Sequence, residues 1–314
     1  MASTLFSQEI EYLEIPLSGE AGDKSLEMSG LTWYGDSLIL MPQNINWKSP
    51  AFYYLTKNEI LKWIKGDKEK SLSPKRLSLI LPDFRTVIPG YQGFEAICFM
   101  DNQAAILIES KSKQGMVGFL AKGYITGKPR ELVIDAQLRT INPPVEIKNM
   151  AFESILYTNS KIMAFFEANG SEINTGPKVE LFSTELKPMG SRPFPFIEYR
   201  ITDVTAVDDR GRFWALNFFW PGEKKILNPG ADIIAEKFGI GNTHKLYNHV
   251  ERLIELQITP TGIVLTDTAP VQLKLDREES HNWEGLARLD NLGFILVTDE
   301  YPRTILAFVP FSSR

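Results

Sequence analysis

A short pattern recurs five times along the chain and limits the folds that the chain can adopt. Each copy has a small or acidic residue, a strand-like run, a tight turn, a second apolar run and another polar residue 14 or 15 positions after the first. Asp, Asn and Gly gather midway while aliphatic and aromatic residues fill both arms, which is typical of a β-hairpin. The copies begin at Ser29, Glu95, Glu153, Asp203 and Glu284.

Hairpins that return about every 50 to 80 residues indicate a β-propeller, in which each repeat is one blade of a ring. Two further strand candidates follow each of the first four hairpins, with the outermost strand of the third blade expected at residues 196–201. One candidate, residues 304–311, follows the last hairpin, so we expect the strand at residues 9–17 to close that blade. The sequence therefore predicts a single all-β propeller domain over residues 1–314. We expect five blades, or six because the interval after Asp203 holds an extra strand candidate.

An insertion is expected at residues 221–249, between the fourth hairpin and the strands that follow it. Its segment ADIIAEKF has the apolar spacing of a helix and lies between glycines. We expect one short helix there, over or beside the face that carries the polar residues.

The composition excludes some classes of function. The formal net charge of −5 disfavours attraction to nucleic acid and to anionic membranes. A single cysteine allows no internal disulfide, and no apolar stretch approaches the ~20 residues of a membrane span. We expect a cytoplasmic protein with neither kind of partner, or a periplasmic or secreted protein if a leader was removed. The oligomeric state is left open.

The five residues that begin the hairpins should converge on one mouth of the central channel. This first ring is Ser29, Glu95, Glu153, Asp203 and Glu284. Crowded carboxylates repel one another and lose solvation, so a bound cation explains the ring. Oxygen ligands suit a hard cation, and a wide ring completed by waters and carbonyls suits Ca²⁺ better than Mg²⁺. The alternative is that each acid caps its own blade by accepting bonds from backbone N–H groups.

A second ring of polar residues ends the hairpins: Gln43, Glu109, Glu167, Asn217 and Asp299. A carboxylate among carboxylates has a raised pKa and accepts a proton near neutral pH, so Glu109 and Glu167 are candidate general bases. Asp299 is a candidate substrate contact. His281, three residues before Glu284, is a candidate general acid or a hydrogen-bonding residue of its loop.

Four basic residues fall on the loops expected to surround the channel mouth: Lys111, Lys148, Arg200 and Arg303. Lysine and arginine clamp phosphoryl oxygens, so a phosphorylated small molecule is a candidate ligand. Singly, each is more often an ordinary surface charge.

The blade starts resemble those of phytase-like propellers, the family labelled esterase-like activity of phytase. The matching segments are Ser-Gly-Leu at 29–31, Gly-Phe-Glu-Ala at 93–96, Phe-Glu-Ser at 152–154, Asp-Val-Thr-Ala-Val-Asp-Asp-Arg-Gly-Arg at 203–212 and Glu-Gly-Leu-Ala-Arg-Leu-Asp at 284–290. The Ser and Glu series is also similar to the calcium-activated apyrases, five-bladed propellers in which a Ser/Glu ring holds one Ca²⁺. The resemblance implies Ca²⁺ bound by some residues of the first ring and hydrolysis of a phosphate ester or anhydride.

The chain departs from this pattern at Asp203 and at Pro42-Gln43-Asn44, where related propellers commonly place an acidic pair. The second departure bears on catalysis more than on metal binding. Two functions therefore stay open: a calcium-dependent phosphohydrolase, and a non-catalytic propeller whose channel metal is structural and whose face binds a partner or small ligand.

Overall fold

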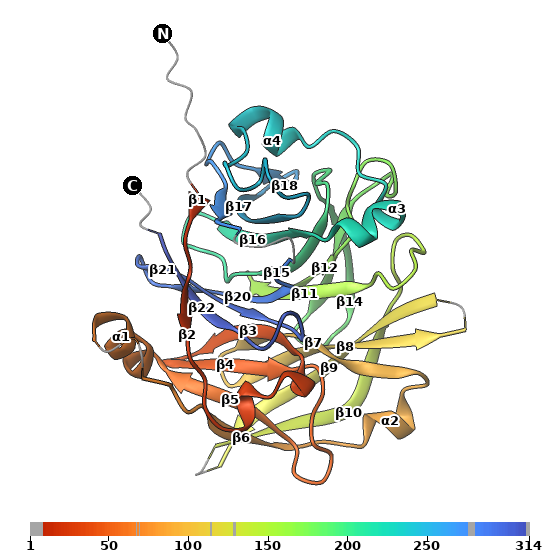
Figure 1. Cartoon of the computed structure of the whole chain (residues 1–314). Coiled ribbons are helices and arrows are strands. Elements are labelled where there is room, and N and C mark those ends of the chain that lie inside the picture. Colours follow the sequence, from red (N-terminus) through yellow and green to blue (C-terminus); the bar gives the residue numbers. More distant parts are fainter. Residues whose placement is uncertain are drawn as a thin grey trace.

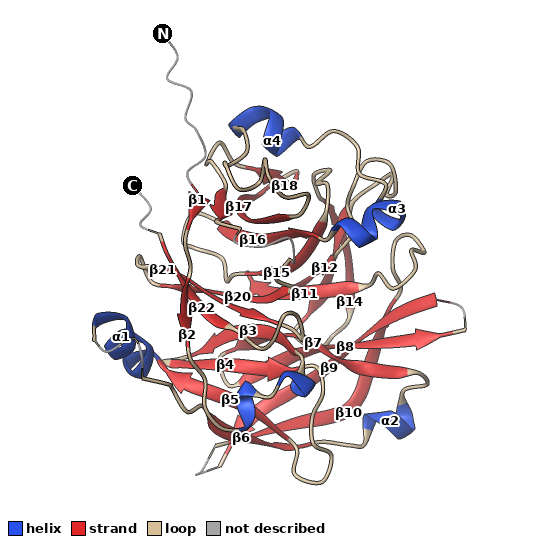
Figure 2. Cartoon of the chain, in the orientation of Figure 1, coloured by secondary structure: helices blue, strands red, loops and turns tan. Residues whose placement is uncertain are grey.

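A computed structural model describes residues 9–311 of the chain, apart from residues 67, 69, 114, 128, 129 and 276–279. The described elements are mostly strands, and they form sheets arranged around a common centre (Figures 1 and 2). The all-β propeller predicted from the sequence is confirmed. Its five hairpins form where apolar runs flank tight turns, because this local pattern determines both the strands and their pairing.

The first two repeat units share one eight-stranded sheet. The first unit consists of β3 (Met28–Tyr34), β4 (Ser37–Pro42), β5 (Ala51–Thr56) and β6 (Lys75–Ile80). The second consists of β7 (Tyr91–Met100), β8 (Gln103–Ser112), β9 (Gly115–Thr126) and β10 (Glu131–Ile141). Neighbouring strands within each unit are antiparallel, whereas the two outermost strands, β6 and β10, run parallel to each other.

The third unit consists of β11 (Phe152–Thr158), β12 (Lys161–Phe166), β13 (Lys178–Ser183) and β14 (Pro188–Pro193). Its outermost strand is β14, so the strand predicted at residues 196–201 is wrong. Phe194 and Ile197 are instead buried in the core between the third and fourth units. Pro195 lies between these two residues and cannot donate a hydrogen bond of a strand ladder, which favours a crossing segment.

The fourth unit consists of β15 (Arg200–Val204), β16 (Arg212–Phe219), β17 (Val250–Thr259), β18 (Gly262–Leu265) and β19 (Val271–Leu273). The sequence offered two alternative outer strands after β17, and both form. β18 pairs with the C-terminal half of β17, and β19 pairs with its N-terminal half.

The fifth unit is closed by the N-terminal segment. It consists of β20 (Trp283–Leu289), β21 (Gly293–Thr298), β22 (Leu306–Pro310) and β2 (Leu13–Ile15). β2 pairs antiparallel with β22, with Glu14 opposite Ala307, so the predicted closure is confirmed. β1 (Glu9–Ile10) lies parallel to β19, so the predicted single strand is divided between the fourth and fifth units.

The first strands of the five units close a ring around the centre. β3 contacts β7, β7 contacts β11, β11 contacts β15, β15 contacts β20, and β20 returns to β3. Apolar clusters fill the spaces between neighbouring units, for example Phe152 and Phe166 with Leu107 between the third and second. The predicted blade count stays a prediction, as do the single domain and the limits of the insertion.

The described helices are short. They are α1 (Lys57–Lys65), α2 (Phe84–Val87), α3 (Lys224–Leu227) and α4 (Ile233–Phe238), with 3-10 turns η1 (Glu20–Gly22), η2 (Lys24–Leu26) and η3 (Pro221–Glu223). Thr56 and Glu59 form a capping box at the start of α1. α4 forms at the helical segment expected within the insertion. None of the described helices is long and apolar enough to cross a membrane.

Candidate functional site

A β-bulge interrupts the first strand of every repeat unit. The residue that the bulge leaves out of register is Ser29 in β3, Glu95 in β7, Glu153 in β11, Thr202 in β15 and Glu284 in β20. A bulged residue is unpaired in the ladder and its side chain is re-aimed. The same local distortion therefore sets one side chain from each unit at the centre of the ring.

The structure changes one member of the first ring. In the fourth unit Ile201 lies opposite Asn217 and Asp203 opposite Leu216, so the bulged residue is Thr202 and not Asp203. Each bulged residue directly follows a large apolar residue: Met28, Phe94, Phe152, Ile201 and Trp283. That sequence signal identifies Thr202, whereas the acidic side chain alone favoured Asp203.

The two hydroxyl members join neighbouring units. The Oγ of Ser29 donates to the carbonyl of Phe94 at 2.6 Å, and the Oγ1 of Thr202 donates to the carbonyl of Trp283 at 2.7 Å. Each acceptor directly precedes the bulged glutamate of the next unit. These bonds therefore fix the backbone that carries Glu95 and Glu284.

Asp203 lies away from the channel mouth. Its carboxylate accepts bonds from the backbone N–H groups of Val204 at 2.8 Å and Leu286 at 2.6 Å. Burial raises the pKa of Asp203, and these bonds oppose the rise. The side chain borders a separate cavity of about 140 Å³. Asp203 thus follows the capping alternative that the sequence left open.

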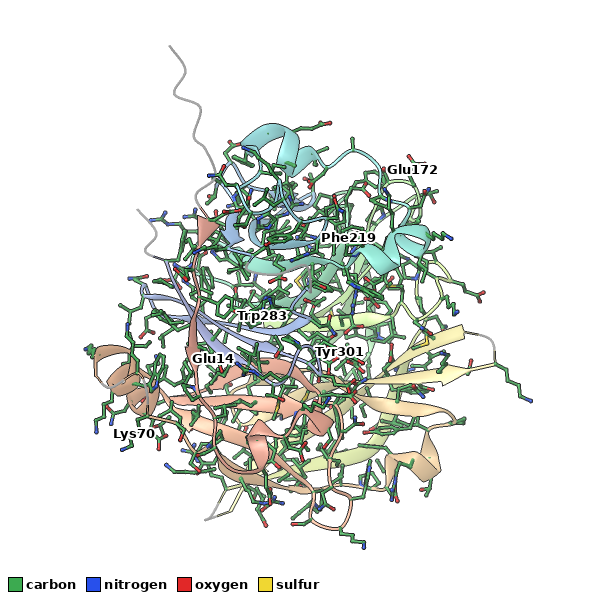
Figure 3. All side chains as sticks on the ribbon, in the orientation of Figure 1. Glu14, Lys70, Glu172, Phe219, Trp283 and Tyr301 are labelled. Atoms are coloured by element: carbon green, nitrogen blue, oxygen red, sulfur yellow. The ribbon has the colours of Figure 1, made fainter. Side chains whose placement is uncertain are left out.

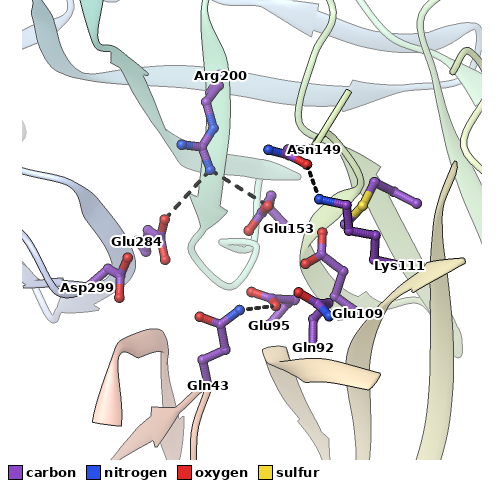
Figure 4. A pocket seen from close by; sticks show the side chains of 11 residues that line it. Gln43, Gln92, Glu95, Glu109, Lys111, Asn149, Glu153, Arg200, Glu284 and Asp299 are labelled. Carbon is purple, nitrogen blue, oxygen red and sulfur yellow. Dashed lines mark hydrogen bonds and ion pairs between the residues drawn. The ribbon is translucent and has the colours of Figure 1, made fainter. Parts of the chain in front are cut away.

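The channel mouth contains a cavity of about 260 Å³ in which acidic side chains predominate (Figure 4). The acids that line it are Glu95, Glu109, Glu153, Glu284 and Asp299. The other polar residues of the lining are Gln43, Gln92, Lys111, Asn149 and Arg200. Eight of the residues named from the sequence therefore meet here, and they come from all five repeat units.

Burial and mutual repulsion perturb the ring glutamates. Burial raises the pKa of Glu95, and the charges of Glu109 and Glu284 raise it further. Burial likewise raises the pKa values of Glu153 and Glu284, with added repulsion from neighbouring carboxylates. The side chains of the chain itself therefore do not fully compensate the negative charge of the mouth.

Arg200 lines the mouth next to Glu153 and Glu284 (Figure 4). Its side chain is 11% exposed, and its Nη2 lies 3.6 Å from Glu284 and 3.7 Å from Glu153. Its Nη1 lies 3.6 Å from Glu223. Burial opposes the charged guanidinium, but the surrounding acids raise the pKa of Arg200 overall. Arg200 is thus a fixed cation of the site.

Glu167 binds the Nε of Arg200 from outside the mouth cavity. Its carboxylate accepts a hydrogen bond from the Nε of Arg200 and another from the backbone N–H of Ala151, at 2.7 Å. The side chain of Glu167 is fully buried and does not line the mouth cavity. Its place is that of a positioning residue, whereas the sequence offered it as a general base.

Glu109 and Lys111 face the cavity from one side of β8, because residues two apart in a strand share a face. Burial and the charge of Glu167 raise the pKa of Glu109 to about 7, while Arg200 and Lys111 oppose that rise. The Nζ of Lys111 donates to the Oδ1 of Asn149 at 2.7 Å. A carboxylate that titrates near neutral pH is suited to accept a proton.

Three more predicted residues, Lys148, Arg303 and His281, lie outside the mouth, as Ser29, Asp203 and Glu167 do. Lys148 is exposed and lines an adjoining cavity of about 420 Å³, which shares Lys111 and Asn149 with the mouth. Arg303 pairs with Glu14 on the surface at 2.6 and 2.8 Å.

His281 is buried beneath the loop that leads into β20. Its backbone N–H donates to Glu251 at 2.8 Å, and its Nε2 lies 3.1 Å from the hydroxyl of Tyr12. It does not line the mouth cavity.

The sequence analysis missed Asn149, Glu223 and Asn282. The Nδ2 of Asn282 donates to Glu284 at 2.8 Å and to Asp299 at 3.0 Å, and so holds both acids of the fifth unit. Asn282 lies two residues before the start of the fifth hairpin pattern, and Glu223 belongs to the insertion. No repeat marks either position.

Fold and site together define this protein as a β-propeller with an acidic, arginine-centred channel mouth. No family model and no curated protein sequence matches the chain. The comparisons therefore do not support the resemblance to phytase-like propellers or calcium-activated apyrases.

Several solved structures are similar to the chain. One is the catalytic domain of the GH62 α-L-arabinofuranosidase of Coprinopsis cinerea, with 7% identity, 97% of each chain covered and a TM-score of 0.49. Another is the GH43 endo-arabinanase of Bacillus licheniformis, with 10% identity, 94% of this chain and 95% of that chain covered and a TM-score of 0.46. A hypothetical protein from Leishmania major has 8% identity, 97% and 90% coverage and a TM-score of 0.45. Likenesses at this level carry no inference about activity.

Proposed function

We propose that the channel mouth binds Ca²⁺ together with a phosphorylated small molecule, whose ester or anhydride bond the protein hydrolyses. The observation that carries this proposal is the excess of acids over bases in one cavity. Five carboxyl groups line it, whereas Lys111 and Arg200 are its two basic residues. A bound cation would relieve the repulsion that raises the pKa values of Glu95, Glu153 and Glu284.

The donor chemistry of the mouth fits a calcium ion. All its acidic groups offer oxygen, the ligand atom that Ca²⁺ prefers. The Oδ1 of Asp299 is buried and has no hydrogen-bond partner within the described part of the chain. Among the described residues, no three acidic, cysteine or histidine side chains are close enough together to enclose a metal. An ion in the mouth would therefore take fewer than three of Glu95, Glu153 and Glu284 as direct ligands and would complete its coordination with water or hydroxyl oxygens.

The proposed reaction assigns roles to four side chains. Arg200 and Lys111 bind phosphoryl oxygens, because both are cations that line the mouth. Glu109 accepts a proton from the attacking water, since its pKa of about 7 permits this near neutral pH. When bound, Ca²⁺ supplies additional positive charge for the phosphoryl oxygens. Glu167 keeps Arg200 in place.

The test is a screen for turnover with and without Ca²⁺. The substrates are ATP, ADP, inositol hexakisphosphate, sugar phosphates and p-nitrophenyl phosphate, with p-nitrophenyl acetate and p-nitrophenyl glycosides as further arms. We expect phosphate release from at least one phosphorylated compound and its loss with chelator. Glu153→Gln should abolish it, whereas Glu11→Gln, which changes a side chain that is 76% exposed, should not. If no phosphorylated compound is turned over, the hydrolase proposal is wrong.

A second candidate function is a non-catalytic propeller that uses the metal for stability. The observation that favours it is the complete engagement of Arg200 by acids of the chain, with which a phosphoryl group would have to compete. In that case Ca²⁺ raises the melting temperature, but no substrate of the screen is turned over in its presence.

A further inference from the structure

A second and larger cavity opens beside the channel mouth. Its volume is about 610 Å³, within the range of about 300–1,000 Å³ that is usual for small-molecule sites. Its wall combines aromatic and polar side chains: Arg200, Phe218, Trp220, Glu223, Asn282 and Tyr301. Figure 3 shows Tyr301 near the middle of the molecule in that view.

Two residues connect the wall of this cavity with that of the mouth. Arg200 lines both, with one nitrogen 3.6 Å from Glu223 on this side and another 3.6 Å from Glu284 in the mouth. Asn282 lines the larger cavity, and its amide holds Glu284 and Asp299. A ligand that occupied both cavities would therefore be bound next to Arg200.

Trp220 offers a flat apolar surface to the larger cavity. It follows β16 directly and is 53% exposed. A Cβ added at Gly222 would lie 2.3 Å from the indole ring, so the ring is folded against the backbone of this glycine. One face of the indole is thereby covered and its position is set. Tyr301 is 60% exposed at the same cavity, so two large aromatic side chains border it without being buried.

Hydrogen-bonding groups lie beside this surface. Glu223 lines the cavity, and its Oε2 is buried with no hydrogen-bond partner among the described residues. Asn282 adds an amide. The face of an aromatic ring carries partial negative charge, on which the polarised C–H groups of a sugar ring pack favourably. A carboxylate and an amide next to such a face match several hydroxyl donors on one ring, whereas a nucleobase has few donors.

We propose that the larger cavity binds a sugar ring, with Trp220 as its platform and Glu223 and Asn282 as hydroxyl-binding groups. The substrate class is then a sugar phosphate whose phosphoryl group lies in the mouth over Arg200. This second statement rests on the proposed function, because it assumes that the mouth binds phosphate. The binding of the sugar itself does not depend on that assumption.

Calorimetric titration of the full chain tests sugar binding directly. The probes are the methyl glycosides of glucose, galactose and mannose, the 1- and 6-phosphates of the same sugars, and adenosine. We expect at least one methyl glycoside and its phosphate to bind, and their affinity to fall about tenfold or more in Trp220→Ala. Gly222→Ala should weaken binding too, because the added methyl group displaces the indole. Tyr124→Ala, which alters an aromatic side chain that is 42% exposed and lines neither cavity, should change nothing.

The outcomes separate the two proposals. If the wild-type protein binds no methyl glycoside, or if Trp220→Ala binds as tightly as wild type, the sugar site is wrong, even when some phosphate is hydrolysed. Binding of adenosine alone likewise overturns it in favour of a nucleoside. If a methyl glycoside binds through Trp220 but no sugar phosphate is hydrolysed, the sugar site stands and the hydrolase proposal fails. The melting temperature of each variant verifies that the fold is retained.

Discussion

At the residue scale, two glutamates at equivalent positions near the mouth have different surroundings and therefore different roles. Glu109 lies in β8 and Glu167 directly follows β12, the equivalent strand of the next unit, yet the first lines the cavity and the second is fully buried beside Arg200. Glu167 receives direct bonds from a guanidinium and a backbone N–H. The burial of Glu109 and the charge of Glu167 raise the pKa of Glu109 to about 7. Contacts, more than residue type, therefore decide which carboxylate is suited to exchange protons.

The pKa of Glu109 predicts the pH dependence of any hydrolysis. A general base acts in its deprotonated form, so kcat should rise with pH and level off above a midpoint near 7. Glu109→Gln should lower kcat by about 100-fold or more and remove this rise. Initial rates at saturating substrate from pH 5 to 9 measure both effects. A wild-type rise that persists unchanged in Glu109→Gln would assign the titration to another group.

At the element scale, the repeated β-bulge is the device that builds the site. Each unit departs from regular pairing at one equivalent position, and the ring of Ser29, Glu95, Glu153, Thr202 and Glu284 results. The strands themselves could be predicted from the sequence, because hairpin patterns are local. The position of the bulge in the fourth unit was not predicted. Adjacent residues of a strand point to opposite faces, so an error of one position assigned Asp203 to the ring instead of Thr202.

The corrected register predicts different effects for two adjacent residues. Asp203→Asn should leave the affinity for Ca²⁺ unchanged, because Asp203 lies outside the mouth cavity and caps backbone N–H groups. It should lower the stability, since one of those N–H groups then faces an amide donor. Glu153→Gln should weaken Ca²⁺ binding. Isothermal titration with Ca²⁺ and urea unfolding separate the two effects. Equal loss of Ca²⁺ affinity in both variants would restore Asp203 to the ring.

Removal of the hydroxyl of Thr202 should destabilise the junction between the fourth and fifth units. Thr202→Val keeps the shape of the side chain but leaves the buried carbonyl of Trp283 without its donor. Such a loss costs about 1–3 kcal/mol. Thr202→Ser retains the hydroxyl and serves as the matched control. Urea unfolding measures both variants, and equal stability of the two would show that the bond contributes little.

At the scale of the whole molecule, closure of the ring combines segments that are farthest apart in sequence. The pairing of β2 with β22 could be predicted because the last unit lacked a strand and the first strand lacked a partner. The places of Arg303 and His281 could not be predicted from spacing alone. The side chain of Arg303 pairs with Glu14 on the surface. The side chain of His281 is buried beside Tyr12. Loop paths depend on tertiary contacts that no local pattern encodes.

The closing strand should contribute strongly to stability. Ile15 of β2 is 1% exposed and packs in the cluster between the fifth and first units. Ile15→Ala should lower the free energy of unfolding by about 2–5 kcal/mol, because it leaves a cavity in that cluster. Leu246→Ala, at a side chain that is 74% exposed, should change it by less than about 0.5 kcal/mol. Comparable urea midpoints for the two variants would contradict the role assigned to β2.

The mouth also predicts how the stability of the entire propeller depends on pH and Ca²⁺. Folding raises the pKa values of Glu95, Glu109, Glu153 and Glu284, so the native state binds more protons than the unfolded state. Their contribution is fully present below the unfolded value of 4.5 and is lost as pH rises, for Glu109 through about 7. In chelator, the melting temperature should therefore fall between pH 5 and 8. Ca²⁺ favours the charged carboxylates, so its stabilisation should be largest at pH 8 and should exceed that of Mg²⁺. Thermal melts across this range test both effects, and a Ca²⁺-induced shift that is equal at pH 5 and pH 8 would place the ion away from these glutamates.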